Sequence, residues 1–346
     1  PHLCRYNERI RIDGQDASDS EIIAAFEKVE ALRQGVALTY FEFGTLAALL
    51  VFAARQVEIA ILEVGMGGRL DAVNAVEPTA SLISNVSLDH CDWLGDNVED
   101  IAREKAGVMR SGKPTVFAAP DMPRAIADEA AAKGAQLIAA MRDYQWSTDA
   151  DQWSWQGQNI ELERLVRPGL AGDIQVQNAA GVLALLEAAG FASLLNRTHV
   201  NQALANVSLT GRGQIVDARI TLDVAHNPAA ASALAQTMSD RAAGQIAVAI
   251  LGMLDDKDVV GVIEPLAPLT NHWIAVTADS PRAIAAKDLA QRVSAATGQD
   301  CFAADSMHEA LDKAYAIAAD DEQILITGSF YTVGSALVIL AAPERE

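Results

Sequence analysis

Short apolar runs rich in β-branched residues alternate with longer Ala- and Leu-rich stretches along most of this chain. The short runs cover residues 57–64, 79–86, 114–119, 218–225, 245–251, 272–278 and 323–328. The longer stretches have the apolar spacing of helices, over residues 20–33, 97–111, 176–189, 228–240, 284–296 and 306–318. Strands that alternate with helices are typical of parallel sheets, because a helix returns the chain to the edge where the next strand begins. The pattern therefore predicts an α/β fold.

Two segments interrupt this alternation. Residues 141–170 alternate polar and aromatic side chains, which is typical of antiparallel strands joined by turns, and predict a small β excursion. A Gly-Arg-Gly sequence at residues 211–213 lies between a helical pattern and a new strand, which indicates a hinge. A chain of 346 residues, 51% of them hydrophobic, exceeds what one average core needs. We therefore expect two domains, residues 1–211 and 212–346.

The charge of the chain excludes one class of partner. A total of 46 acidic residues against 26 basic residues gives a formal net charge of −20, which opposes a surface for polyanions. The aromatic residues do not interleave with basic residues as they do in a stacking platform. We expect no nucleic-acid partner, although a local basic pocket for a phosphate or carboxylate remains compatible with this charge.

Hydropathy and cysteine content bear on localisation. The apolar stretch at residues 45–54 is about half the length that crosses a bilayer, and no basic segment precedes an apolar one at the start. Cys4, Cys91 and Cys301 lie far apart in the sequence, in no pattern typical of a disulfide framework or a zinc site. These features predict a soluble cytoplasmic protein without a membrane partner.

Residues 106–115, "AGVMRSGKPT", contain a partial match to a phosphate-binding loop. Gly107, Gly112 and Lys113 fit the pattern, but Pro114 stands where a Ser or Thr would bind magnesium. A working loop follows a strand and begins a helix, whereas this one follows the helical pattern 97–111 and precedes a strand. We expect Gly112 to end that helix as a C-cap, so that the segment is a helix end and not a nucleotide site.

Three chemically active side chains follow the predicted strands. Glu63 ends the run 57–64 before a glycine-rich segment, and His90 follows the run 79–86. Lys105 lies in the predicted helix after His90. Open α/β sheets bind ligands at the carboxyl ends of their strands, and a carboxylate with an imidazole there can bind one or two divalent cations. Each residue also has an ordinary structural interpretation, as a cap, a hydrogen-bonded scaffold or a solvated charge.

A series of strings identifies a family that the chain resembles. They include "LTYFEFGTLAAL", "ILEVGMGGRLDAVN", "SLDHCDWLG", "REKAGVMR", "LTGRGQIV", "LDVAHNP", "GMLDDKD" and "ITGSFYTVG". In this order they resemble the bacterial dihydrofolate synthase/folylpolyglutamate synthase family of the Mur ligase superfamily. The resemblance implies a central P-loop-NTPase-like domain with a parallel sheet, incomplete at its N-terminus, followed by a Rossmann-like glutamate-ligase domain.

The resemblance also implies an activity. Members join the carboxylate of dihydropteroate, or of a folate already carrying glutamate, to the amine of L-glutamate, with hydrolysis of ATP to ADP and phosphate. A carboxylate is a poor acyl donor, so ATP first converts it to an acyl phosphate, and Mg²⁺ neutralises the phosphate charge. The expected cofactors are ATP and two Mg²⁺ ions. The expected partners are these small molecules, and the expected state is a monomer.

Site residues follow from the same resemblance, position by position. Glu63 and His90 match magnesium ligands, and Lys105 matches a lysine that is carbamylated in the family. The positions that match ATP contacts are Asn178, Arg212 and Asp223. The positions that match the pterin-binding wall are Leu38, Thr39, Tyr40, Phe41, Leu70, Asp71 and Ala72. The positions that match the glutamate site are Arg9, Ser329 and His226, of which His226 is assigned a catalytic role together with Lys105. For Asn178 and Ser329, capping of a helix is an equal alternative.

The sequence departs from the family in one respect. The family's glycine-rich phosphate loop, and a Thr-Ser pair whose Ser binds magnesium, precede the position of Pro1 and are not among these 346 residues. We expect a ligase whose N-terminal part is missing from this sequence, and the activity of these residues alone stays open. One alternative is another Mur-type ligase, acting on cell-wall precursors. A second is a non-catalytic folate-binding remnant that has lost the phosphate loop.

Overall fold

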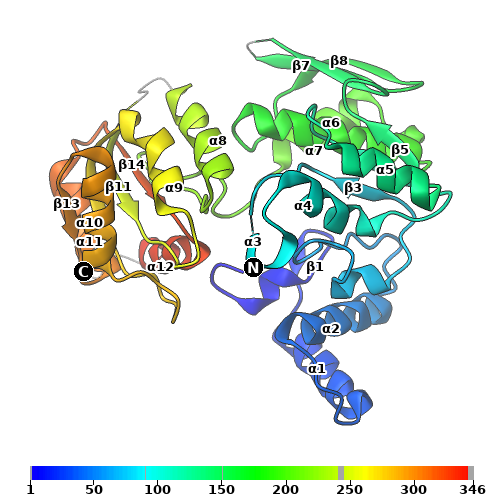
Figure 1. The fold of residues 1–346 in the computed structure, drawn as a ribbon, viewed down its shortest axis with the longest axis horizontal. Helices are drawn as coiled ribbons and strands as arrows, with labels where there is room; N and C mark the ends of the chain where they lie inside the picture. The colour runs from blue at the N-terminus through cyan, green and yellow to red at the C-terminus, as the bar shows by residue number, and fades with distance from the viewer. Residues whose placement is uncertain (1, 90, 150, 241–244, 342–346) are drawn as a thin grey trace. The chain divides into compact units, whose positions relative to one another are not determined.

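The computed structural model describes residues 2–89, 91–149, 151–240 and 245–341, with Cys91 and Asp92 described by their backbone alone. Contacts between Cα atoms divide the chain into two units (Figure 1). The N-terminal unit consists of Asn7–Pro168 and Val176–Asn206. The C-terminal unit consists of Pro1–Tyr6, Gly169–Gln175 and Val207–Glu346. The segment that begins the chain therefore belongs to the C-terminal unit, which the sequence pattern did not indicate.

A three-stranded parallel sheet forms the centre of the N-terminal unit. Its strands are β3 (Ser81–Ile83), β4 (Pro114–Phe117) and β5 (Gln136–Ala139), in that order. The side chains of β4 alternate between two cores. Phe117 packs in the cluster that contains Ala102 of α4 (Val98–Lys105) and Ile126 of α5 (Arg124–Lys133), whereas Val116 packs in the cluster of α6 (Asp173–Ala188). Helices on both faces thus bury this sheet.

The predicted β excursion is confirmed. The strands β6 (Gln145–Thr148), β7 (Gln152–Gln156) and β8 (Glu161–Val166) form an antiparallel sheet. Trp153 and Trp155 of β7 are fully buried in the cluster shared with α6 and α7 (Arg197–Asn206). The carboxylate of Glu187 in α6 accepts the backbone N–H groups of Gln158 and Asn159, which fixes the β7–β8 turn on the helix.

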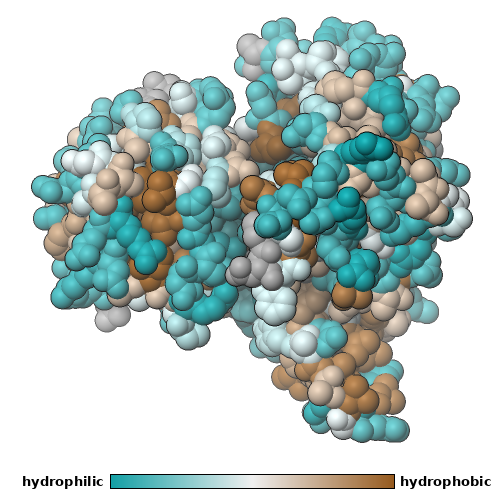
Figure 2. All heavy atoms as spheres, in the orientation of Figure 1, coloured by the Kyte–Doolittle hydropathy of each residue, from teal (hydrophilic) through white to brown (hydrophobic). Residues whose placement is uncertain are grey.

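A helical hairpin precedes the parallel sheet. Helices α1 (Asp19–Arg33) and α2 (Tyr40–Arg55) each begin with a capping box, Ser18 with Glu21 and Thr39 with Glu42. The short strands β1 (Arg11–Ile12) and β2 (Gln15–Asp16) form a separate antiparallel pair. Figure 2 shows hydrophobic surface on this hairpin, whose exposed apolar side chains include Ile23, Leu32, Val36 and Leu46.

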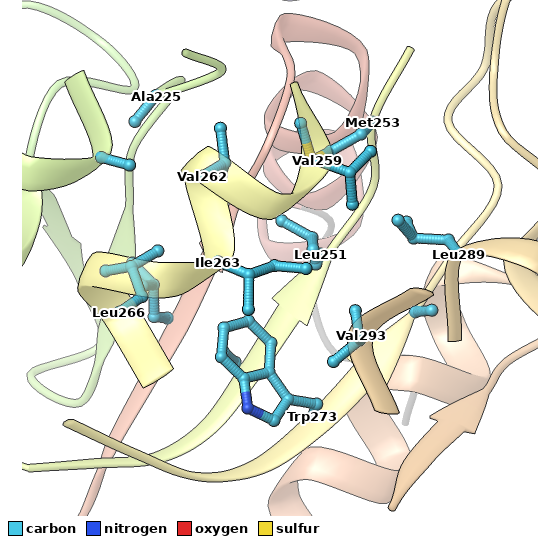
Figure 3. Close-up of a cluster of buried hydrophobic side chains, with 14 of the residues drawn as sticks. Ala225, Leu251, Met253, Val259, Val262, Ile263, Leu266, Trp273, Leu289 and Val293 are labelled. Atoms are coloured by element: carbon cyan, nitrogen blue, oxygen red, sulfur yellow. The ribbon is translucent and has the colours of Figure 1, made fainter. Parts of the chain in front are cut away.

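The C-terminal unit contains a six-stranded sheet in the order β13-β12-β11-β14-β10-β9. All neighbouring strands are parallel except β9 and β10. The strands are β9 (Gln214–Val216), β10 (Ile220–Leu222), β11 (Ile246–Leu251), β12 (Thr270–Ala275), β13 (Cys301–Ala303) and β14 (Gln323–Thr327). The helices are α8 (Pro228–Ser239), α9 (Val259–Leu266), α10 (Ala286–Thr297), α11 (Met307–Ile317) and α12 (Phe330–Leu340). In Figure 3, Trp273 and Leu251 of the sheet pack against Ile263 of α9 and Val293 of α10.

Short elements complete the described chain, as helix α3 (Cys91–Leu94) and the 3₁₀ helices Tyr6–Arg9, Ala72–Ala75, Ala106–Val108, Ala192–Leu194 and Ala267–Leu269. The predicted α/β fold with parallel sheets is confirmed, and most of the predicted helices and strands have counterparts in the structure. Within the part of the chain that the structure describes, no helix combines the length and apolarity needed to cross a bilayer.

One predicted strand is wrong, and one predicted helix is shorter than expected. Residues 57–64 form no strand and pair with none among the described residues, and Ile61 is 90% exposed. An apolar run becomes a strand only where a neighbouring strand takes up its backbone groups. The helix predicted over 97–111 ends at Lys105, and Ala106–Val108 form a 3₁₀ turn. Gly112 therefore is not its C-cap; it has a φ of 67° in the turn before β4, where it donates to the carbonyl of Gly134.

Candidate active site

The glycine-rich loop after Glu63 is organised by the carboxylate of Asp71. Its Oδ2 accepts the backbone N–H groups of Gly65 and Met66, both at 3.0 Å. Its Oδ1 accepts the N–H of Val73 at 2.9 Å, as the N-cap of the 3₁₀ helix Ala72–Ala75. Three backbone donors thus converge on one side chain, which closes the loop on itself. This structural role was not predicted from the sequence, which suggested Asp71 only as a pterin ligand.

The same loop lies against the end of helix α4. The N–H of Arg69 donates to the carbonyl of Glu104 at 2.9 Å, and the guanidinium of Arg69 pairs with the Glu104 carboxylate. A Cβ atom at Gly107 would overlap the backbone of Arg69, so only glycine permits this approach. The loop that follows Glu63 is therefore held beside the turn of α4 that carries Lys105.

Lys105 occupies a site that disfavours its charge. Burial lowers the pKa of its ammonium, and the negative charge of Asp89 opposes this shift in part. Asp89 follows the carboxyl end of β3. Asp89 was not among the predicted site residues, although the string "SLDH" after a predicted strand contained the signal. His90, the next residue, lies outside the described residues.

The site has oxygen donors suited to a hard divalent cation. Glu63 is exposed on the segment before the loop, and Asp89 acts electrostatically on Lys105. Carboxylates are the ligands that Mg²⁺ prefers, and a carbamate on Lys105 would add another anionic oxygen. Among the residues that the structure describes, no three His, Cys, Asp or Glu side chains form a ready metal cluster. The assignments of Glu63, His90 and Lys105 to a metal site stay predictions.

One segment of the predicted pterin wall contacts the glycine-rich loop, at Phe41 and Gly65. A Cβ atom built on Gly65 would lie 2.7 Å from Cζ of Phe41, so the ring rests directly on the glycine backbone. Tyr40 and Leu70 are 64% and 80% exposed, and Ala72 begins the 3₁₀ helix after Asp71. Of the remaining members of this group, Leu38 lies in the segment before α2 and Thr39 is the N-cap of α2.

Arg9, predicted in the glutamate site, lies in this part of the molecule. Its guanidinium carbon is 5.4 Å from the centre of the Tyr40 ring, in the geometry of a cation–π contact. Asn178 lies inside α6, well after its first residue Asp173, so it does not cap that helix. The structure therefore removes one of the two interpretations of Asn178.

A second group gathers at the carboxyl ends of β10 and β14. The carboxylate of Asp223 accepts the N–H groups of Gly213 and Ala225, each at 2.8 Å. The carbonyl of Gly211 accepts the N–H of Val224 at 2.9 Å. These bonds tie the loop that carries Arg212 to the end of β10. Arg212 is half-buried, so its charge is available at this edge of the sheet.

His226 and Ser329 lie in the same group. The Nδ1 of His226 is 2.9 Å from the carbonyl oxygen of Val224. A neutral ring that donates through Nδ1 leaves Nε2 as the acceptor. The hydroxyl of Ser329 accepts the N–H of Thr332 and caps α12, so the capping interpretation of Ser329 is observed. The side chain of Ser329 is buried, with 3% of the residue exposed.

Comparison with known proteins gives two domain matches. Residues 24–186 match the Mur ligase middle domain, and residues 211–330 match the Mur ligase glutamate ligase domain. The dihydrofolate synthase/folylpolyglutamate synthase of Escherichia coli K12 is 38% identical over 344 residues, which cover 99% of this chain and 79% of the relative. The chain belongs to the dihydrofolate synthase/folylpolyglutamate synthase family.

Solved structures of this family agree with the assignment. "E.coli FolC in complex with DHPP and ADP" has a TM-score of 0.91 and 38% identity, and the match covers 98% of this chain and 80% of that one. A bifunctional folylpolyglutamate synthase/dihydrofolate synthase with Mn, AMPPNP and L-glutamate bound has a TM-score of 0.90 and 39% identity, over 99% of this chain and 81% of that one. The family and the fold expected from the sequence are thus confirmed, and the cell-wall-ligase and non-catalytic alternatives are not favoured. The assignments of individual site residues stay predictions.

Proposed function

We propose that this member of the dihydrofolate synthase/folylpolyglutamate synthase family adds L-glutamate to dihydropteroate, to folylpolyglutamates, or to both. The reaction consumes ATP and releases ADP and phosphate. The observation that carries the proposal is the similarity over nearly the whole chain to an enzyme of this name, joined by structures of relatives with ADP, with AMPPNP and with L-glutamate bound. The chain is thus an ADP-forming ligase of folate metabolism.

The C-terminal unit supplies groups for the nucleotide. We assign phosphate binding to Arg212, because a guanidinium offers several N–H donors in a planar fork. Asp223 is assigned to the ribose hydroxyls. Its oxygens already accept the backbone N–H groups of Gly213 and Ala225, so it also holds the loop of Arg212. Asn178 of α6, which belongs to the N-terminal unit, is assigned a further contact with ATP.

The N-terminal unit supplies groups for the metal. We assign Glu63 and His90 as ligands of divalent cations, with a carbamate on Lys105 as a further anionic group. Carbon dioxide adds only to a neutral amine, and burial favours the neutral form of Lys105. The bound Mg²⁺ would neutralise negative charge on the phosphates. The carboxylate of Glu63 and the lowered pKa of Lys105 both suit a site for divalent cations.

The remaining assignments concern the two other substrates. The pterin is assigned to the surface formed by Leu38, Thr39, Tyr40, Phe41, Leu70, Asp71 and Ala72. L-Glutamate is assigned to Arg9, Ser329 and His226, with His226 in a catalytic role. Since the hydroxyl of Ser329 caps α12, the main chain at this helix start is the more available part of that residue. We further propose a cytoplasmic monomer without a nucleic-acid partner.

The test is an ADP-release assay on the protein expressed with any coding sequence that precedes Pro1. With ATP, Mg²⁺ and dihydropteroate present, we expect ADP release that depends on L-glutamate, and a product heavier by one glutamyl residue. A UDP-linked cell-wall precursor should not replace dihydropteroate. Binding of ADP and dihydropteroate without any glutamate-dependent release would instead support the non-catalytic alternative.

A further inference from the structure

One aromatic ring in the C-terminal unit contacts two of the assigned site residues. The guanidinium carbon of Arg212 lies 5.7 Å from the centre of the Phe330 ring. The imidazole of His226 lies 5.8 Å from the same centre, with the two ring planes inclined by 52°. Phe330 therefore lies beside a cation and an imidazole, although it is far from both Arg212 and His226 in the sequence.

The backbone that carries this ring is held firmly. Phe330 is the first residue of α12, directly after the N-cap Ser329. The hydroxyl of Thr332 donates to the carbonyl of Gly252 at 2.9 Å and lies 2.7 Å from the hydroxyl of Ser329. The phenyl ring itself packs, half-buried, on the core cluster that contains Val333. A ring attached to such a well-held backbone can restrict the orientation of neighbouring side chains that have more rotatable bonds.

Contact with the ring restricts the orientation of both Arg212 and His226. Arg212 has a long side chain with several rotatable bonds, and its backbone lies in a loop between two glycines with positive φ. Ordering such a side chain has an entropic cost, which a favourable contact in the free protein reduces. The face of an aromatic ring attracts a guanidinium because its π electrons carry negative charge. The ring also limits the rotation of the His226 imidazole, whose Nδ1 lies against Val224.

We propose that Phe330 is a positioning residue that holds Arg212 and His226 in their working orientations. The inference rests on the proposed function, because the importance of these orientations lies in nucleotide and glutamate binding. It assigns Phe330 no contact with the reacting atoms. The aromatic character of the ring, and not only its apolar bulk, raises the affinity for ligand. It does so by orienting Arg212.

The first test measures the contact without any reaction. The Nε–H proton of Arg212 is followed by ¹H–¹⁵N NMR in the intact chain. Phe330→Leu, which removes the ring and keeps an apolar side chain, should shift this signal, whereas Phe330→Tyr should leave it close to the wild-type position. Arg219 is a matched control, since it lies 4.7 Å from the ring of Tyr315 in the same unit. Its signal should respond to Tyr315→Leu and not to Phe330→Leu.

The second test measures ligand binding. Phe330→Leu should weaken ADP binding by about 3- to 30-fold, the range expected from loss of one cation–π contact, and Phe330→Tyr should restore it. In the Arg212→Met background the same Phe330→Leu change should have little further effect on ADP affinity. Equal loss of affinity in both backgrounds, or failure of Phe330→Tyr to restore it, would show that Phe330 acts only through packing and would overturn the inference.

The two proposals fail in different ways. If wild-type protein binds ADP and the Arg212 signal ignores the ring, the positioning inference is wrong and the proposed function stands. If the Arg212 signal responds to the ring but neither ADP nor ATP binds the wild type, the contact exists and the proposed function fails. Melting temperature, followed for every variant, should fall more for Phe330→Leu with Arg212 present than with Arg212→Met, because only the first loses the cation–π contact in addition to packing.

Discussion

The backbone N–H of Gly213 donates to Oδ2 of Asp223 at 2.8 Å, while Oδ1 of the same carboxylate accepts the N–H of Ala225 at 2.8 Å. One side chain thus joins the Gly-Arg-Gly loop to the end of strand β10. Because Arg212 lies between the two glycines of that loop, its position depends on Asp223. Asp223, which is assigned to ATP binding, therefore also anchors the loop of Arg212, which has the same assignment.

Asp223→Asn should impair both stability and nucleotide binding. Asparagine keeps one carbonyl oxygen, so one of the two N–H groups loses its acceptor and faces an amide donor instead. We expect a loss of about 1–3 kcal/mol in the free energy of unfolding, measured by urea denaturation. ADP affinity, measured by calorimetry, should fall as the Arg212 loop loosens.

Asp320→Asn provides the matched control. Asp320 is a fully exposed carboxylate in the same unit, paired with Arg219 at 3.3 Å. Exposed ion pairs contribute little, so the change should alter the free energy of unfolding by less than about 1 kcal/mol. If Asp223→Asn behaves like Asp320→Asn in both measurements, the anchoring role of Asp223 is wrong.

Asp71→Ala should disorder the loop that follows Glu63. It removes the acceptor of the Gly65, Met66 and Val73 N–H groups. We expect a cost of about 1–3 kcal/mol in unfolding free energy, together with weaker binding of both dihydropteroate and divalent cation. Loss of dihydropteroate binding alone, with unchanged stability and unchanged Mn²⁺ binding, would assign Asp71 to the pterin and not to the loop.

Lys105 should form a carbamate. Burial lowers the pKa of its ammonium, so at a given pH more of the neutral amine is present than for an exposed lysine. Protein equilibrated with ¹³C-bicarbonate should give a carbamate ¹³C signal that Lys105→Ala removes and that Lys113→Ala, at an exposed lysine, retains. Short carboxylic acids should partly restore the activity of Lys105→Ala. Absence of both the signal and the rescue would leave Lys105 an ordinary buried lysine.

The two buried tryptophans of β7 should respond differently to replacement by phenylalanine. The Nε1–H of Trp153 donates to the carbonyl of Val166 at 2.9 Å, whereas Nε1 of Trp155 is buried without a hydrogen-bond partner among the described residues. Trp153→Phe loses a hydrogen bond, but Trp155→Phe removes an unsatisfied donor. Urea denaturation should find Trp155→Phe less destabilising by about 1 kcal/mol. Equal losses of unfolding free energy in the two variants would indicate that the loss of side-chain volume alone sets the cost.

Cys301 should resist alkylation. Burial raises the pKa of its thiol to about 12. The thiolate is the reactive form, so very little of Cys301 is reactive at pH 8, and its alkylation rate should rise steadily with pH. Cys4 is exposed and should react first with iodoacetamide, as followed by peptide mass spectrometry. In denaturant the two should react at similar rates; a fast Cys301 in the folded protein would contradict its burial.

The sequence predicted correctly those elements whose apolar pattern is matched by a packing partner in the fold. The run 245–251 became strand β11, Ile246–Leu251, and the stretch 20–33 became helix α1, Asp19–Arg33. The run 57–64 had an equally apolar pattern, yet it forms no strand, because strand formation needs a neighbouring backbone that no local pattern specifies. The helix that ends at Lys105 was predicted too long, since the turn that ends it packs on Arg69 from a separate loop.

The alternation of strands and helices, the family and the candidate site residues can all be read from the order of residues along the chain. What several of those residues contact depends on how the chain folds. An aspartate in a sequence carries no indication of which N–H groups turn toward it, so the loop-closing bonds of Asp71 and Asp223 appear only in three dimensions. In the same way, Phe330 meets Arg212 and His226 because parallel strands bring distant segments to one edge of a sheet.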